Sequence, residues 1–130
     1  MVSNVELRER LAKVARGPVL TAGDPGYDDS RRVFNAMIDR WPAAILKCSC
    51  ADDVAYGVTI ARECGLPLSI KGGGHSVAGN AVCDDGLMLD MSPMRRISVD
   101  PEHSLAVGDA GLTLGQAAGL ADLVAPEPQE

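Results

Sequence analysis

Three consecutive glycines, Gly72 to Gly74, are the feature that most constrains how this chain can fold. Glycine has no Cβ atom, so the backbone there can adopt positive φ and approach a ligand closely. Lys71 precedes the glycines, and before it lies the apolar run 66–70, which predicts a strand. A glycine-rich loop that leaves a strand is a common way to hold a diphosphate. A plain tight turn also needs glycines, so both interpretations stay open at this point.

The residues next to the glycines bring a charge and two nucleophiles to the same loop. Lys71 supplies a positive charge, while the His75 imidazole and the Ser76 hydroxyl follow the glycines. Outside this setting His75 would more simply cap a carbonyl group, and Ser76 either binds phosphate or only turns the chain. The candidate cofactor-binding residues are Lys71, Gly72, Gly73, Gly74, His75, Ser76 and Gly79.

Length, composition and charge indicate one globular domain with no nucleic-acid or membrane partner. The chain has 130 residues, of which 46% are hydrophobic, and this is typical of a folded soluble protein. Its net charge of -6 argues against nucleic acid, which requires a basic surface. The N-terminus is charged where a signal peptide is apolar, and no apolar run is long enough to span a bilayer. We therefore expect a cytoplasmic protein.

The four cysteines are expected to be free thiols, because disulfides are rare in the cytoplasm. A zinc site is a weaker interpretation, since structural zinc ligands usually come in pairs two to four residues apart. We expect no metal at the cysteines, which are Cys48, Cys50, Cys64 and Cys83.

Two helices are expected in the first third of the chain. Ser3 or Asn4 begins the first helix, which runs to about Ala15. The second runs from residues 28–30 to about Asp39. The side chains that the second helix would bury are Val33, Phe34, Met37 and Ile38.

A βαβ unit is predicted in the middle of the chain. The unbroken apolar run 43–48 predicts a buried strand. A capping box of Ser49 and Asp52 would begin the following helix, and Gly65 would end it. A second strand is expected at 68–70, so the glycines would follow the carboxyl end of a parallel strand, where ligands of open α/β sheets bind.

The pattern becomes antiparallel after about residue 80. Residues 86–91 predict a strand, and the alternating runs 96–100 and 104–108 predict a hairpin with one buried face. Thr113 would begin a last helix.

Short motifs over about residues 20 to 112 carry a family resemblance. They are Gly23–Tyr27, Pro42–Ile45, Asp52–Val54, Lys71–Ser76, Gly86, Leu89–Ser92, Val99–Pro101 and Val107–Gly111. In their order and spacing the chain resembles the N-terminal part of the FAD-linked oxidases of the berberine-bridge and vanillyl-alcohol-oxidase type. The Lys-Gly-Gly-Gly-His-Ser sequence is highly specific in that setting.

The resemblance implies the first part of a PCMH-type FAD-binding domain of the α+β class. In this fold a small parallel βαβ unit with flanking helices is followed by antiparallel strands. The implied division is a helical lead-in at 1–41, a partial FAD-binding domain at 42–125 (α/β part 42–80, antiparallel part 81–112, last helix 113–124) and a tail at 125–130.

The resemblance also implies FAD as the cofactor, with its diphosphate on the glycines. In many members the histidine at the position of His75 is bonded to the flavin 8α-methyl carbon, and a neutral imidazole is a competent nucleophile near pH 7. The family moves a hydride from an alcohol, amine or sugar carbon to flavin N5 and passes the electrons to oxygen. Lys71 stands where the family often has arginine. The substrate domain and the catalytic base would lie beyond residue 112.

Two alternatives to an FAD-dependent oxidoreductase stay open. The first is a catalytically inactive remnant or interaction module that keeps only the first half of the fold. A hairpin built for absent strands exposes edges and apolar surface, so such a chain would self-associate or pair with a missing C-terminal half. The second is a nucleotide-phosphate binder unrelated to flavin.

Overall fold

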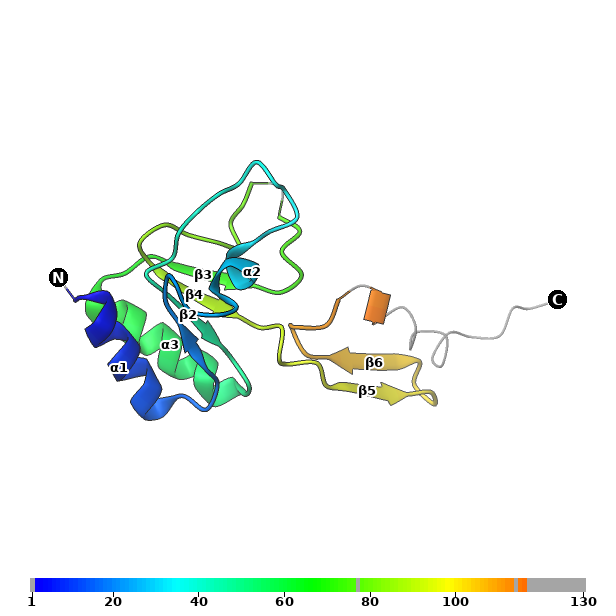
Figure 1. Cartoon of the computed structure of the whole chain (residues 1–130). Helices are drawn as coiled ribbons and strands as arrows, with labels where there is room; N and C mark the ends of the chain where they lie inside the picture. The colour runs from blue at the N-terminus through cyan, green and yellow to red at the C-terminus, as the bar shows by residue number, and fades with distance from the viewer. Residues whose placement is uncertain (1, 77, 114, 117–130) are drawn as a thin grey trace.

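A four-stranded sheet organises the main body of the molecule, residues 2–92 (Figure 1). The computed structural model describes residues 2–76, 78–113 and 115–116. In spatial order the strands are β1 (Val19–Leu20), β2 (Ala44–Lys47), β4 (Leu87–Asp90) and β3 (Leu68–Lys71). β2 and β3 each pair in parallel with β4, and β1 pairs antiparallel with β2.

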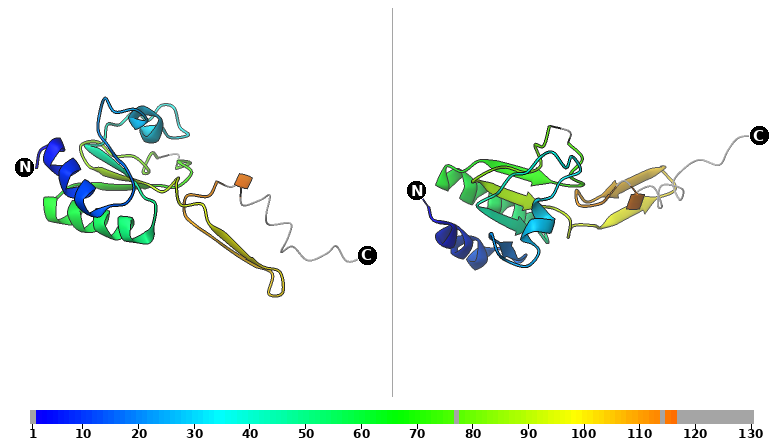
Figure 2. Two further views of the ribbon diagram at one scale, coloured as in Figure 1. Left: turned by 60° about the horizontal axis from the view of Figure 1, so that its bottom comes forward. Right: turned by 45° about the horizontal axis from the view of Figure 1, so that its top comes forward.

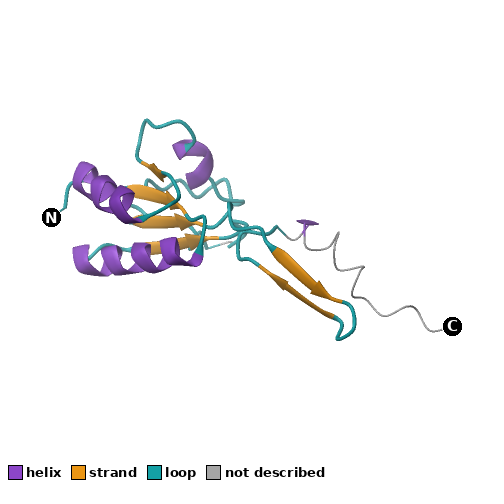
Figure 3. Cartoon of the chain, turned by 90° about the horizontal axis from the view of Figure 1, so that it is seen from below, coloured by secondary structure: helices purple, strands orange, loops and turns teal. Residues whose placement is uncertain are grey.

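Helices cover one face of this sheet, and irregular segments cover most of the other (Figure 3). α1 (Asn4–Val14) and α3 (Ala51–Cys64) pack on the face that Leu46 and Leu89 present. On the opposite face, Ile45 and Met88 contact Tyr27 of the short helix α2 (Tyr27–Arg31). β2 and β4 therefore lie between two apolar layers, as their continuous apolar sequences require.

The ends of the helices follow local signals in the sequence. Ser3 and Glu6 form a capping box at α1, as the first predicted helix requires. Gly65 ends α3 in the left-handed conformation, with φ of 64°, as predicted. The predicted capping box of Ser49 and Asp52 is wrong, because Ser49 instead donates two hydrogen bonds to Asp53.

The strand β4 corrects the expectation that the antiparallel part begins at residue 81. β4 lies between β2 and β3 and is parallel to both. Consecutive strands β2 and β3 are therefore not neighbours, although the connection through α3 joins two parallel strands as predicted. The order of strands depends on pairing between distant residues, which no local pattern reports. The α+β class is confirmed, since a parallel sheet is followed by an antiparallel hairpin.

The second predicted helix, to about Asp39, is wrong over most of its length. α2 ends at Arg31, and Arg32 already has an extended backbone with ψ of 136°. The Arg31 guanidinium donates hydrogen bonds to the Asp39 carboxylate and to the Arg40 carbonyl, so the chain after α2 folds back toward the end of that helix. Val33 is buried as predicted and Ile38 is half-buried, but Phe34 is 73% exposed and Met37 is 90% exposed.

The hairpin projects away from the main body (Figure 2). β5 (Ile97–Asp100) and β6 (Leu105–Gly108) pair antiparallel, as predicted. The predicted single buried face is wrong. Asp100 pairs with Leu105 and Ser98 with Val107, so the two large apolar side chains of β6 lie opposite polar residues of β5. Ile97 and Val99 share the other face with Ala106, but no residue of the hairpin is fully buried on either face.

The remaining predictions concern thiols, termini and membranes. The four cysteines are free, and burial raises the pKa of the Cys48 thiol to about 12, so that it stays protonated in the core. Thr113 and Gln116 exchange hydrogen bonds at the start of the predicted last helix. The rest of that helix and the tail at 125–130 lie outside the described residues. Over the described part of the chain, every helix is too short or too polar to cross a bilayer.

Candidate functional site

The glycine loop, residues 72–76, leaves the carboxyl edge of the parallel sheet, as predicted. It follows Lys71, the last residue of β3. In the register of the sheet, Lys71 lies beside Asp90, and Asp90 lies beside Lys47. Three parallel strands therefore end at one level, which is the edge where ligands of such sheets bind.

The main-chain N–H groups of the glycine loop are available to a ligand. Among the described residues, none of the N–H groups at positions 72–76 donates a hydrogen bond. Gly74 is nevertheless buried, and its carbonyl accepts a hydrogen bond of 2.8 Å from the Phe34 N–H. Gly74 is the buried residue of the five, while Gly73 and His75 are exposed, so these donors are open to solvent or to a ligand. Successive N–H groups in such a turn can converge on an anion.

Two of the glycines are required for different reasons. Gly74 has φ of +73°, a conformation that side chains with a Cβ rarely adopt. A Cβ on Gly72 would lie 2.8 Å from the Ala110 carbonyl oxygen, where the chain returns from the hairpin. Gly72 and Gly74 are therefore required by the chain's own packing, and this requirement is compatible with a loop that also binds a ligand.

Lys71 is held against α2. Its half-buried side chain donates a hydrogen bond of 2.8 Å from Nζ to the Ser30 carbonyl. Burial lowers the pKa of the ammonium, and Arg32 and Lys47 nearby add to this, whereas Asp90 opposes it. An ammonium has three donors, so one bond to Ser30 leaves Lys71 able to contact an anion as well.

His75, Ser76 and Gly79 occupy the exposed end of the loop and the turn after it. The His75 ring is exposed, with its centroid 5.2 Å from that of Phe34 and the rings tilted by 35°. The Ser76 carbonyl accepts a hydrogen bond of 3.0 Å from the Gly79 N–H. Gly79 itself is buried with φ of +77°. Among the predicted residues, the Lys71 side chain contacts Ser30 and the His75 ring lies beside Phe34, so these two side chains have different neighbours.

Sequence reasoning missed a segment that runs along the loop, residues 32–40, which we call the strap (Figure 1). The Phe34 N–H donates a hydrogen bond to the Gly74 carbonyl in the loop. The Arg40 guanidinium donates a hydrogen bond of 2.8 Å to the Gly79 carbonyl, just after the loop. The Ile38 side chain packs on Gly79, within 2.9 Å of where a Cβ would be. The apolar spacing of these residues imitates a helix, so the sequence carried a misleading signal for them.

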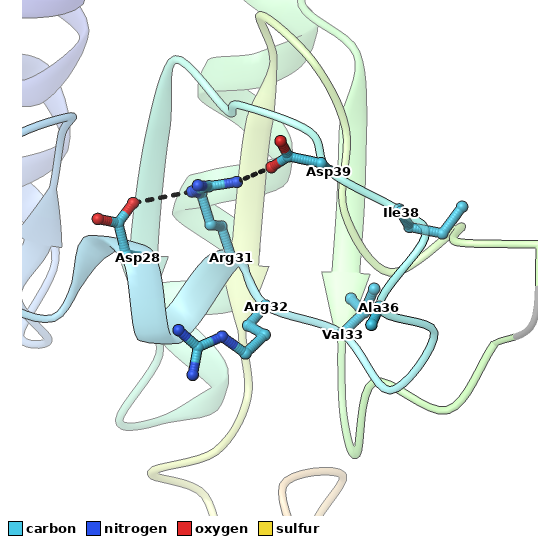
Figure 4. A pocket seen from close by; sticks show the side chains of 7 residues that line it. All are labelled: Asp28, Arg31, Arg32, Val33, Ala36, Ile38 and Asp39. Carbon is cyan, nitrogen blue, oxygen red and sulfur yellow. Dashed lines mark hydrogen bonds and ion pairs between the residues drawn. The ribbon is translucent and has the colours of Figure 1, made fainter.

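An open pocket of about 380 Å³ lies between α2 and the strap (Figure 4). Arg31 bridges Asp28 and Asp39 across it and stacks on Trp41, with Cζ 3.7 Å from the ring centroid. The hydrogen bonds to Asp28 and Asp39 raise the pKa of Arg31, so its guanidinium serves the protein's own structure. The pocket is lined by Asp28, Arg31, Arg32, Val33, Ala36, Ile38 and Asp39.

Comparisons with protein families and with individual proteins give a consistent result. A family model described as an FAD binding domain matches residues 42–125. The uncharacterized FAD-linked oxidoreductase YgaK of Bacillus subtilis is 34% identical over 100 residues, covering 77% of this chain and 22% of that protein. (R)-6-hydroxynicotine oxidase of Paenarthrobacter nicotinovorans is 33% identical, with the same two coverages of 77% and 22%. The chain therefore spans about a fifth of the length of these relatives.

Solved structures show the same fold. 6-Hydroxy-D-nicotine oxidase from Arthrobacter nicotinovorans superposes with a TM-score of 0.76 at 30% identity, covering 84% of this chain and 24% of that one. A glucooligosaccharide oxidase from Acremonium strictum, whose structure revealed a novel flavinylation, gives a TM-score of 0.76 at 34% identity, with coverages of 89% and 24%. The similarity extends over most of this chain.

Proposed function

Because this chain belongs to the FAD-binding domain family found in FAD-linked oxidoreductases, we propose that its glycine loop holds the diphosphate of FAD and that His75 anchors the flavin covalently. When bound, FAD supplies the two-electron acceptor, and the protein supplies binding and orientation. The residues proposed to contact it are Lys71, Gly72, Gly73, Gly74, His75, Ser76 and Gly79.

The observation that carries this proposal is the row of main-chain N–H groups at 72–76 that donate to no described residue. Successive N–H groups in a turn form a concave site for phosphate oxygens. Such contacts do not depend on side chains, so the glycines can bring the backbone close to the diphosphate.

Lys71 contributes a point charge to the same site. Its bond to the Ser30 carbonyl orients the ammonium, and its remaining donors can contact a phosphate oxygen. An arginine at this position would offer a planar, two-pronged contact, which lysine cannot make. We therefore expect Lys71 to add affinity through charge rather than through a bidentate bond.

The activity proposed for the whole protein is oxidation of a substrate carbon, with hydride transfer to flavin N5 and electrons passed to dioxygen. Relatives named as oxidases of 6-hydroxynicotine and of glucooligosaccharides support this reaction type. The proposal for the described residues is narrower, because they supply cofactor binding and no assigned substrate contact.

A second candidate function, association through the hairpin, is favoured by its exposed apolar side chains. Leu105 is 58% exposed and Val107 is 71% exposed on one face, while Ile97 and Val99 are half-exposed on the other. Apolar side chains on both faces of a two-stranded ribbon favour packing between further polypeptide layers. The partner would be a second copy of the chain or a polypeptide that completes the domain.

The decisive experiment asks whether flavin remains on the protein. The chain is purified with FAD, dialysed, precipitated with acid and examined for flavin absorbance in the pellet. Wild type and His103→Ala, which alters an exposed histidine in the hairpin turn, should both give coloured pellets. His75→Ala should bind FAD reversibly but give a colourless pellet.

Other outcomes separate the alternatives. A colourless wild-type pellet from protein that still binds FAD would refute the covalent anchor only. Dialysed native protein without FAD would refute the cofactor site and favour the interaction module. Equal displacement of FAD by NAD and by ADP would favour a general nucleotide-phosphate binder.

A further inference from the structure

The strap is hydrogen-bonded to the glycine loop near its start and to the segment after that loop at its end. Near its start, the Phe34 N–H donates to the Gly74 carbonyl at 2.8 Å. At its end, the Arg40 guanidinium donates to the Gly79 carbonyl at 2.8 Å and to the Val82 carbonyl at 3.1 Å. The hydrogen bond from Phe34 to Gly74 therefore ties this part of the strap directly to the loop.

Phe34 of the strap places its ring beside the histidine proposed as the flavin anchor. Its ring lies beside the His75 imidazole at a centroid distance of 5.2 Å, within the range of attractive aromatic pairs. Its main chain bonds the residue directly before His75. Its ring is 73% exposed, so burial in the core does not explain an aromatic residue here.

We propose that Phe34 is a positioning residue for His75, a role that rests on His75 being the flavin anchor. An imidazole on an exposed loop can rotate about two side-chain bonds. A neighbouring ring fixed to the same loop restricts that rotation and holds one imidazole nitrogen toward its target. Restricting a nucleophile to a productive orientation accelerates bond formation.

The attachment that Phe34 assists is balanced in atoms and electrons. One imidazole nitrogen bonds the methyl carbon of the flavin benzene ring, and the nitrogen and the carbon each lose one hydrogen. Those two hydrogens and the electron pair reduce the flavin, and dioxygen reoxidises it with formation of hydrogen peroxide. Phe34 takes no part in these transfers and only orients His75.

The test compares the rate of covalent flavin incorporation among strap variants. Phe34→Ala and Phe34→Leu, which both remove the ring, should attach flavin about tenfold more slowly than wild type. Phe34→Tyr keeps the ring and should attach it at a rate within about twofold of wild type. Met37→Ala removes a more exposed side chain from the same strap and serves as the matched control.

A second readout separates orientation from cofactor binding and from folding. The dissociation constant of FAD, measured in a His75→Ala background, should change by less than about twofold on adding Phe34→Ala. The NMR signals of the His75 ring protons should show a ring-current shift in wild type and Phe34→Tyr that is absent in Phe34→Ala. This spectrum requires no flavin, so it tests the ring contact by itself.

Several results would overturn the inference. Wild-type attachment rates in Phe34→Ala and Phe34→Leu would show that the ring is dispensable. Equal slowing in Phe34→Tyr, or a loss of reversible FAD affinity as large as the loss of rate, would make Phe34 a structural or binding residue. Absence of any attachment in wild type would instead refute the covalent anchor itself, and the positioning role with it.

Discussion

The main body and the hairpin use similar apolar strands but bury them very differently. All four residues of β4 are buried, whereas all four residues of β6 are exposed. β4 lies between β2 and β3 and is covered by an apolar layer on each face of the sheet. Within the described residues, β6 pairs with β5 alone, and no layer covers either face of the hairpin. A strand's sequence therefore indicates which side chains can be buried, but the surrounding layers decide whether they are.

The register of the hairpin sharpens this contrast. In the main body, Leu46 of β2 lies beside Leu89 of β4 and Ile45 beside Met88, so apolar side chains add up on each face. In the hairpin, the large side chains Leu105 and Val107 pair with Asp100 and Ser98, so they gain no large apolar neighbour across the strand pair. The main body should therefore carry the stability of the fold, and the hairpin should carry little of it.

The largest expected effect of a single change falls on a buried carboxylate in the main body. Asp53 accepts hydrogen bonds from the main-chain N–H groups of Arg16, Gly17 and Ser49 and from the Ser49 hydroxyl. Asp53→Ala leaves these donors unpaired and should lower the free energy of unfolding by about 4 kcal/mol. Urea unfolding, followed by Trp41 fluorescence, measures this loss of stability. The control is Asp52→Ala, which changes an exposed neighbour and should alter the free energy of unfolding by less than about 0.5 kcal/mol.

The same carboxylate predicts a dependence on pH. Burial opposes ionisation of Asp53, but the hydrogen bonds from Ser49, Arg16 and Gly17 outweigh it and lower its pKa. A lowered pKa means that the stabilisation is fully present above the unfolded-state value of about 3.9 and is lost as the pH falls through the folded-state value. The difference between wild type and Asp53→Ala should therefore narrow below about pH 4. A constant difference down to acid pH would contradict the role of the charge.

Much of the main body could be predicted because its signals are local. The capping residues of α1, the glycine that ends α3, and the apolar runs of β2 and β3 each act within a few residues. The position of β4 could not be predicted, because it depends on pairing with two strands from other parts of the chain. The two-residue strand β1 was not expected at all, since it is defined only by its pairing with β2.

The candidate site shows the same limit. The glycine loop and its place at the sheet edge were predicted, because the strand and the glycines are adjacent in sequence. The strap was assigned to a helix, because the apolar residues from Val33 to Ile38 follow helical spacing. The actual path of the strap is determined by hydrogen bonds from Phe34 to Gly74 and from Arg40 to Gly79. These acceptors lie about forty residues further along the chain, where no local pattern reports them.

The next largest effect is expected from truncating a buried apolar side chain in the main body, compared with truncating an exposed one in the hairpin. Leu89 is fully buried against α3, so Leu89→Ala should lower the free energy of unfolding by about 3 kcal/mol. Val107→Ala in the hairpin should change it by less than about 0.5 kcal/mol. Urea midpoints at a constant m-value would establish both effects. A comparable loss from Val107→Ala would mean that the hairpin is part of the cooperative core.

Changes to the exposed apolar side chains of the hairpin should have the smallest effect on stability and the clearest effect on association between chains. Replacing Leu105 and Val107 together by serine removes the apolar side chains from one face of the hairpin. We expect the unfolding free energy to change by less than about 0.5 kcal/mol, while concentration-dependent association in sedimentation velocity becomes weaker. Val5→Ser is the matched control, because Val5 is 65% exposed but lies on α1.

The control decides what the hairpin contributes. If Val5→Ser weakens association as much as the hairpin pair does, the effect reflects general surface hydrophobicity. If wild type remains monomeric at every concentration, a second copy is not the partner of this surface. Weakening confined to the hairpin variant would establish that the region least able to stabilise the fold is the region that joins it to another polypeptide. The contrast between the two regions would then be one of function as well as of burial.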